Sequence, residues 1–505
     1  MNKPLARVES LRSLGLRLLI ICGFITLVYY FSWWSEVDTF HSIWLVLWLL
    51  AAIIYAAVQI VANWALYWLA KQPESPPPVP PRLSVDVYVT AYGEPVGMVR
   101  QSLQAACNMH GEHKTWLLDD GNDPLLSNLA AHLGAGYLTR PNLENAKAGN
   151  LNAALIRTTG DIIVIFDIDH IPSPDFLERT LGYFGDPGVG FVQVMLTFSN
   201  SGETWVAKAA AETSLDYYNP ISLGAYEIGG TTLMGSNALI RRKALESIGG
   251  YQPGLAEDLA TSITLHAAGW RSAYVAEPLA PGLAPPDLTA WFTQQLKWAR
   301  GVFELLLTAY PRLFSRLTWG QRLSYAVRMT KYWIGPAVWF HLFVTIGILI
   351  FGSFITRAEF HEYLYHITPL VLFDAVIRYA ALRVFRPSET QSTSLIRAIT
   401  LVYATWPIYM SAWLMAVLRL PLGFRPTPKR LSGRLNPLWL LPQILAVISL
   451  IIGIAYTVIV IGHPVSVLLA FAVIQGLLQL LLLARWLHLE ETTPDKESRY
   501  LPEVE

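Results

Sequence analysis

The chain has 505 residues, of which 53% are hydrophobic and only 15% are charged. This composition is too apolar for a soluble protein and the length too great for one domain, so a membrane protein with a sizeable water-facing part is predicted. Lysine plus arginine and aspartate plus glutamate balance at 37 each. No net field attracts nucleic acid, which is not expected as a partner. The two cysteines, Cys22 and Cys107, form no CxxC pair, which excludes a disulfide framework and a cysteine-based zinc site.

Residues 1–72 are expected to form an N-terminal membrane segment with two spans. The uncharged run 18–34 follows four basic residues, and no small-residue cleavage site comes after it, so a span is favoured over a signal peptide. The uncharged run 43–70 is long enough to cross a bilayer core of about 30 Å. Residues 73–82 are rich in proline and are expected to be a stiff linker.

Residues 83–284 are expected to form an α/β domain. Short apolar runs at 85–89, 115–118, 137–138 and 162–166 alternate with helix-length stretches, which predicts a mostly parallel sheet covered on both faces. Ligands of such sheets bind at the carboxyl ends of the strands. Asp119, Asp167 and Asp169 stand at such ends, so their carboxylates should gather at one edge.

The Asp167-Ile168-Asp169 motif has two interpretations. Mg²⁺ and Mn²⁺ prefer oxygen ligands and commonly sit between carboxylates and substrate phosphates, so the pair could hold such a cation for a nucleotide-sugar. Alternatively, the two aspartates merely end a strand and cap the next helix.

The membrane pattern returns after residue 331. Residues 285–331 are expected to form interfacial helices, and 332–487 to hold four spans. These spans are 332–356, 363–385 and two within 435–484. In the second of them Asp374 and Arg378 share a helical face, as a structural ion pair or as part of a channel lining.

The uncharged run 398–418 could also cross, but a crossing would push the basic residues of 425–434 outside, against the positive-inside bias. An interfacial helix at 396–420 and a loop at 421–436 are therefore expected. About six spans result, in the inner (plasma) membrane, with both termini and the α/β domain in the cytoplasm. Residues 488–505 are expected to be a cytoplasmic tail, too short for a cyclic-dinucleotide receptor (PilZ) domain.

Eight short motifs follow one another along the chain: 90–94 (TAYGE), 119–121 (DDG), 146–152 (AKAGNLN), 167–169 (DID), 235–237 (GSN), 256–258 (AED), 294–298 (QQLKW) and 424–429 (FRPTPK). In this order, and combined with the predicted membrane spans, the motifs resemble those of the membrane-embedded processive family 2 glycosyltransferases, the cellulose synthase-like group. The resemblance implies a GT-A-like, Rossmann-like domain inserted in an α-helical membrane domain.

The resemblance also implies roles for single residues. Asp258 matches the family's catalytic base, and it and Glu257 could at the same time cap the helix expected at 259–266. Asp167 and Asp169 would hold Mg²⁺ or Mn²⁺, and Asp119 would join them in the catalytic set. The nucleotide would be bound by Thr90, Tyr92, Glu94, Asp119, Lys147, Lys297 and Arg300; the acceptor by Gln294, Trp298, Gly235 and Ser236; and a gating loop would use Phe424, Thr427 and Lys429.

Two departures from the family pattern bear on substrate. Lys297 stands where arginine is usual and lacks the bidentate fork suited to phosphate, a task that Arg300 could share. Met234 and Ala256 replace the frequent cysteine and threonine, which weakens strict cellulose identity.

The expected function is polymerisation of a UDP-sugar, UDP-glucose above others, into a β-linked glucan passed through the protein's own spans. The expected partners are the UDP-sugar donor, the growing polysaccharide acceptor, membrane lipid and a periplasmic or outer partner subunit. Two alternatives stay open: a glycolipid synthase that adds one or a few sugars to a lipid, and a catalytically inactive channel or scaffold subunit.

Overall fold

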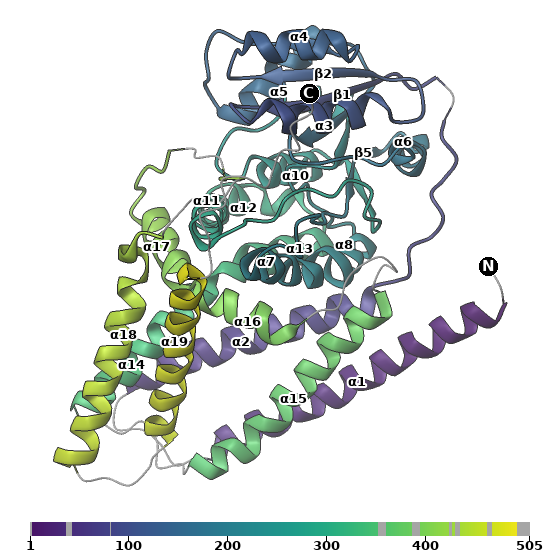
Figure 1. Cartoon of the computed structure of the whole chain (residues 1–505). Coiled ribbons are helices and arrows are strands. Elements are labelled where there is room, and N and C mark those ends of the chain that lie inside the picture. The colour runs from purple at the N-terminus through teal and green to yellow at the C-terminus, as the bar shows by residue number, and fades with distance from the viewer. Residues whose placement is uncertain are drawn as a thin grey trace.

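The computed structural model describes residues 3–36, 43–80, 82–351, 360–385, 394–423, 427–429, 435–461 and 467–491. Phe424, expected in the gating loop, lies outside these residues. A sheet-containing domain occupies one end of the molecule, and long apolar helices occupy the other (Figure 1).

Seven strands form one mixed sheet in the order β3-β2-β1-β4-β6-β5-β7. All neighbouring pairs are parallel except those that involve β6, which runs antiparallel to β4 and β5. The strands are β1 (Val85–Ala91), β2 (Lys114–Asp119), β3 (Gly136–Leu138), β4 (Ile162–Asp167), β5 (Val189–Val194), β6 (Ala238–Arg241) and β7 (Arg271–Val275). The expected α/β domain with a mostly parallel, Rossmann-like sheet is confirmed.

Helices cover both faces of the sheet, and the central strands β1 and β4 are accordingly apolar apart from Asp86, Thr90 and Asp167. Val87 and Val89 of β1 pack on one face with residues of α3, α4 and α6. Tyr88 and the β4 residues Ile163 and Ile165 pack on the other face with α5 and α9. The covering helices are α3 (Val96–Cys107), α4 (Pro124–His132), α5 (Ala146–Arg157), α6 (Phe176–Thr180), α9 (Arg242–Ser247) and α10 (Glu257–Ala267).

A middle layer of helices separates the sheet from the apolar helices (Figure 1). It consists of α7 (Trp205–Asp216), the π-helical turn η2 (Tyr217–Ile221), α8 (Ser222–Glu227), α11 (Leu288–Leu307), α12 (Ala309–Leu313) and α13 (Trp319–Thr330). Asp287 begins α11, since its side chain accepts a hydrogen bond from the Ala290 amide at 2.8 Å.

Four segments of the described chain are long and apolar enough to cross a membrane: Leu11–Ser35, Leu50–Leu69, Trp319–Ile350 and Pro437–Val460. The helices at this end of the molecule are α1 (Lys3–Glu36), α2 (Ile43–Leu69), α14 (Ile334–Phe351), α15 (Phe360–Phe385), α18 (Leu441–Tyr456) and α19 (Val467–Glu491). The expected span at 363–385 is a continuous helix, α15, but it carries charges and is not among the four. Within α19 only a shorter apolar stretch, Ala472–Ala484, is found. The six-span topology stays a prediction.

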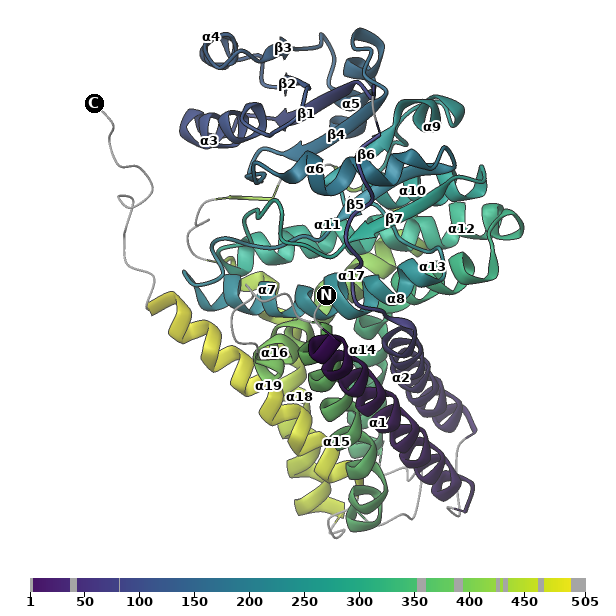
Figure 2. The same cartoon turned by 90° about the vertical axis from the view of Figure 1, so that its right-hand side faces the viewer.

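The run expected to lie at the membrane surface forms two helices, α16 (Leu395–Ala404) and α17 (Trp406–Val417), bent by 44° at the break between them. This pair would add a fifth crossing only as a single broken span. α16 lies against α7 (Figures 1 and 2), where Arg397 pairs with Glu212 through two bonds of 2.7 and 2.9 Å.

Candidate active site

The carboxyl ends of β1, β2 and β4 meet at one edge of the sheet and form the floor of a pocket of about 450 Å³. Strand pairing places Thr90 opposite Asp167 and Ala91 opposite Asp119. The Thr90 hydroxyl donates to Asp167 Oδ1 at 3.4 Å. The predicted convergence of polar residues at this edge is therefore present in the fold.

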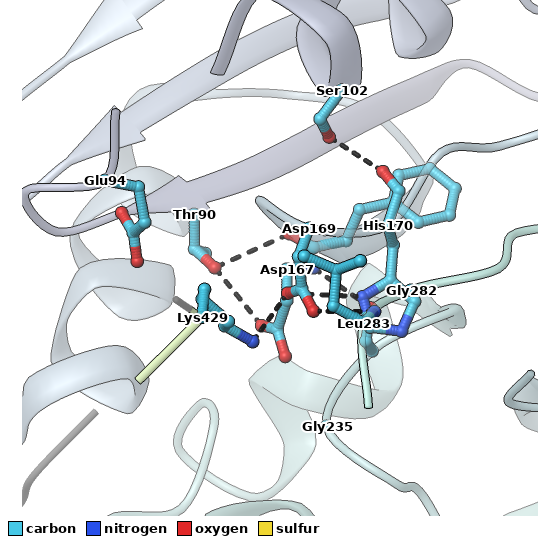
Figure 3. Close-up of polar contacts among 12 residues, drawn as sticks. Thr90, Glu94, Ser102, Asp167, Asp169, His170, Gly235, Gly282, Leu283 and Lys429 are labelled. Carbon is cyan, nitrogen blue, oxygen red and sulfur yellow. Dashed lines mark hydrogen bonds and ion pairs between the residues drawn. The ribbon is translucent and has the colours of Figure 1, made fainter. Parts of the chain in front are cut away.

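Asp167, Asp169 and His170 form a cluster whose ligand atoms lie within 4.8 Å of one another (Figure 3). Asp169 Oδ2 accepts from the Leu283 amide at 3.1 Å. His170 is buried, and neither of its ring nitrogens has a hydrogen-bond partner. His170 Nδ1 lies 3.6 Å from Asp169 Oδ1. Two carboxylates and an imidazole that makes no hydrogen bond are a donor set that fits a divalent cation. His170 was missed in the sequence, although it directly follows the motif.

Two lysines reach this cluster from distant parts of the chain. Lys147, in the first turn of α5, forms an ion pair with Asp167 and donates to the Gly235 carbonyl at 2.7 Å. Lys429 Nζ lies 2.9 Å from Asp169 Oδ1. Burial alone would raise the pKa of Asp169, but Lys429 and His170 outweigh it and hold that pKa well below its usual range.

Three of the expected site residues, Asp119, Ser236 and Arg300, are not among the residues that line the pocket. Asp119 is fully buried, and its oxygens accept from the Gly121 and Asp123 amides and the Tyr137 hydroxyl, each at 2.8 Å. Ser236 is buried, and its hydroxyl accepts from the Asp167 amide at 3.0 Å. Arg300 pairs with Glu304 at 2.7 Å and donates to the Leu420 carbonyl at 3.2 Å.

Asp120, the neighbour of Asp119, lines the pocket instead. Arg140 holds it with two bonds of 2.7 Å, and also donates to the Glu144 and Ala146 carbonyls at 2.7 Å. The alternation of side chains along a strand end decides which of two adjacent aspartates faces the ligand. Arg140 was not predicted because only tertiary structure brings it to Asp120.

Tyr92 and Glu94, expected at the nucleotide, line the same end of the pocket. The Tyr92 amide donates to Glu94 Oε2 at 2.6 Å. Burial raises the pKa of Glu94.

Asp258 lies in the first turn of α10 and lines the pocket. Its Oδ1 accepts from the Leu259 amide, in the same turn, at 2.7 Å. The N-cap position itself is Ala256, which makes no side-chain cap. A Cβ atom on Gly235 would lie 3.7 Å from Asp258 Oδ2 and 3.9 Å from Lys147 Nζ. Gly235, which has a φ of +88°, therefore brings these groups close together.

Asp258 shares its buried site with another carboxylate, Glu257. Burial raises the pKa of Asp258, and burial together with Asp258 raises the pKa of Glu257 to about 7. A carboxylate with a raised pKa in a cleft is a candidate general base.

The wall opposite the sheet is α11, which presents Gln294, Lys297 and Trp298 to the pocket. Gln295 is buried and accepts from the Tyr409 hydroxyl at 2.9 Å, which fixes α11 against α17. Burial lowers the pKa of Lys297. We call the part of the pocket lined by Asp258, Trp298, Tyr332 and Tyr409 the acceptor half. Thr427 also lines the pocket, beside Lys429.

Family models match this part of the chain. Residues 80–301 match the model described as glycosyltransferase like family 2, and residues 242–387 match the model described as cellulose synthase. A mannosyltransferase from Pyrobaculum calidifontis, solved with GDP-Man and Mn²⁺, aligns with a TM-score of 0.52 at 18% identity, over 73% of this chain and 99% of its own. The chain thus contains a family 2 glycosyltransferase domain of GT-A-like fold.

Curated relatives narrow the family. Cellulose synthase 1 of Komagataeibacter xylinus is 33% identical over 62% of this chain and 21% of its own length. The UDP-forming cellulose synthase catalytic subunits of Xanthomonas axonopodis pv. citri and Pseudomonas fluorescens are 34% and 32% identical over 65% and 70% of this chain. The matches span 46% and 48% of those two proteins, so the chain spans half or less of these relatives. These matches confirm the resemblance of the motifs to the cellulose synthase-like family 2 glycosyltransferases.

Proposed function

We propose that the protein is an inverting glycosyltransferase that extends a β-linked polysaccharide from a UDP-sugar, with UDP-glucose as the donor and Mg²⁺ or Mn²⁺ as the cofactor. One observation carries the proposal. A single pocket joins the Asp167, Asp169 and His170 cluster to Asp258, and continues along Trp298 toward the apolar helices. The UDP-forming relatives support the choice of donor.

The chemistry assigns a task to each side of the pocket. Asp167, Asp169 and His170 would hold the cation, which neutralises charge on the departing diphosphate when bound. Lys147 and Lys429 would bring two further positive charges to the diphosphate, and Thr90, Tyr92 and Glu94 would line the nucleoside end. Asp258 would take the proton from the acceptor hydroxyl. The hydroxyl oxygen of the acceptor would bond to C1 of the donor sugar as the bond from C1 to UDP breaks.

The acceptor half fits a sugar chain. The Trp298 indole offers an apolar plate for a sugar ring, and the Gln294 amide offers hydrogen bonds to its hydroxyls. Tyr332 and Tyr409 continue the lining from η4 (Lys331–Trp333) and α17. The product would leave along this side and cross the inner membrane through the spans. The α/β domain then lies in the cytoplasm, and Thr427 and Lys429 belong to a loop that closes over the nucleotide.

Product length from the purified protein tests the proposal. Radiolabelled UDP-glucose and other UDP-sugars are supplied with Mg²⁺ or Mn²⁺, and products are separated by size and solubility. A long, water-insoluble chain that a glucanase digests is the expected result. If every donor yields only chloroform-soluble lipid with one or two sugars, the polymerase assignment is wrong and the protein is a glycolipid synthase.

A further inference from the structure

A second cavity, of about 100 Å³, lies beside the acceptor half, between α2, η2, α13 and α15. It shares part of its wall with the main pocket, namely Thr213, Tyr217, Met234, Arg328 and Lys331. The proposed transfer reaction leaves this cavity without a task.

The two carboxylates of this cavity region, Asp216 and Asp374, already have hydrogen-bonding partners. Arg378 on α15 pairs with Asp216 at 3.1 Å and with Asp374 at 2.8 Å. The Tyr67 hydroxyl donates to Asp216 at 2.7 Å, and the Trp64 indole donates to Asp374 at 3.0 Å. One arginine and two neutral donors therefore satisfy both aspartates.

Two other cations, Arg328 and Lys331, face the cavity without such partners. Arg328 donates to the Tyr217 hydroxyl and the Thr232 hydroxyl, which are both uncharged. Lys331 Nζ lies 5.2 Å from the centre of the Tyr217 ring. Within the described ranges, neither cation has a carboxylate at ion-pair distance. Asp258 attracts Arg328 and Asp216 attracts Lys331 only from beyond ion-pair distance. An anion bound between the two cations would form a direct ion pair with each of them.

An orphaned hydroxyl completes the site. Thr231 lines the cavity, is 2% exposed, and its Oγ1 has no hydrogen-bond partner. Two cations and a free hydroxyl are the donors that recognise a phosphate-type oxyanion. The cavity contains a single aromatic ring, that of Tyr217, whereas a neutral sugar chain is usually held on aromatic plates.

The walls indicate where the anion comes from. Gln59 and Asn63 line the cavity from α2, within a segment apolar enough to span a membrane, and Arg378 lines it from α15. Polar residues at such positions are expensive and usually serve a function. We propose that this cavity binds the phosphate of a membrane-lipid headgroup, held by Arg328 and Lys331 next to the acceptor half.

Binding to the full-length protein tests the proposal without any transferase assay. The protein is delipidated in an uncharged detergent, and its Tm is followed against dioctanoyl phosphatidylglycerol, dioctanoylglycerol, inorganic phosphate and cellotetraose. We expect a saturable rise in Tm with the phosphatidylglycerol alone. Arg328→Gln and Lys331→Gln should each weaken that apparent affinity about fivefold. Lys331→Arg keeps the charge and should preserve the apparent affinity for phosphatidylglycerol. This variant also shows whether the position tolerates substitution.

Arg312→Gln is the matched control, because Arg312 is exposed on α12 and lies outside the cavity lining. Its affinity should equal that of the unmodified protein. An equal rise with dioctanoylglycerol, or an affinity unchanged in Lys331→Gln, would overturn the site. If inorganic phosphate or cellotetraose alone reproduces the Lys331-dependent rise, the occupant is a free anion or a sugar, and the lipid assignment is wrong.

Discussion

Replacing Asp258 by asparagine should separate catalysis from nucleotide binding. The new amide side chain would keep an oxygen that can accept from the Leu259 amide, as the carboxylate does at 2.7 Å, so the first turn of α10 should not change. What the variant loses is the basic oxygen that faces Gly235 and the pocket. A general base contributes about 10²–10⁴-fold, or about 3–5 kcal/mol of barrier. We expect a rate loss of that size with UDP affinity within a few-fold.

The assay measures initial transfer rates from radiolabelled UDP-sugar, and UDP affinity by calorimetry, in the same preparations. Glu257→Gln is the matched control, because it removes a buried carboxylate one residue away; it should keep more than about a tenth of the rate. Asp169→Ala should instead weaken metal-dependent UDP binding. Near-normal turnover of Asp258→Asn would refute the assignment of the base.

The pH dependence of the same reaction is a second test of Asp258 as the general base. The base acts only when ionised, and burial raises the pKa of Asp258. The transfer rate should therefore fall as the pH is lowered, from a higher pH than an ordinary carboxylate would dictate. The residual activity of Asp258→Asn should lack this acid limb.

Three further results are expected. Burial lowers the pKa of His266 to about 3, so at mildly acidic pH the unfolded state is protonated before the folded state. As the pH drops below about 6.5, the free energy of unfolding should decrease, by about 1.4 kcal/mol at pH 5.5. His266→Gln should flatten this pH dependence in Tm measurements. Lys429→Gln, but not Lys114→Gln, should raise the Mn²⁺ affinity of the nucleotide-free protein about tenfold in an EPR titration, since it removes a cation that competes for Asp169; an unchanged affinity would contradict that competition. Trp298→Ala should abolish long products on sizing gels while Trp298→Phe allows some, because each added sugar must rebind against this ring; long products from Trp298→Ala would contradict this role.

The sheet was largely predictable because the apolar character of its central strands is visible in the sequence. β4 is a run of five apolar residues that ends in Asp167, and β1 is apolar except for Asp86 and Thr90. Helix-length segments lie between such strands, a pattern typical of a covered parallel sheet. β6 has four residues, and its antiparallel pairing with β4 depends on a chain reversal that no local pattern encodes. The bend between α16 and α17 likewise depends on packing, since Trp291 donates to Thr405 at the break.

The site was predictable where chemistry and strand ends coincide, as at Asp167 and Asp169. The site was less predictable where two adjacent residues point in different directions, because the sequence does not show that Asp120, and not Asp119, lines the pocket. Long-range pairs were beyond any local pattern, since Lys429 meets Asp169 across 260 residues of sequence. The tight fit of His170 against Gly282, where a Cβ would lie 2.6 Å from Nε2, also appears only in the fold.

The ion pairs of Arg378 have a consequence for how the chain is made. α15 carries Asp374 and Arg378, and each charge near the middle of an isolated membrane helix costs about 2.5–3.5 kcal/mol on insertion. Their partners outside α15, Trp64 and Asp216, both precede it in the chain and are synthesised earlier. We therefore expect α15 to dock only after α7, which carries Asp216, has folded.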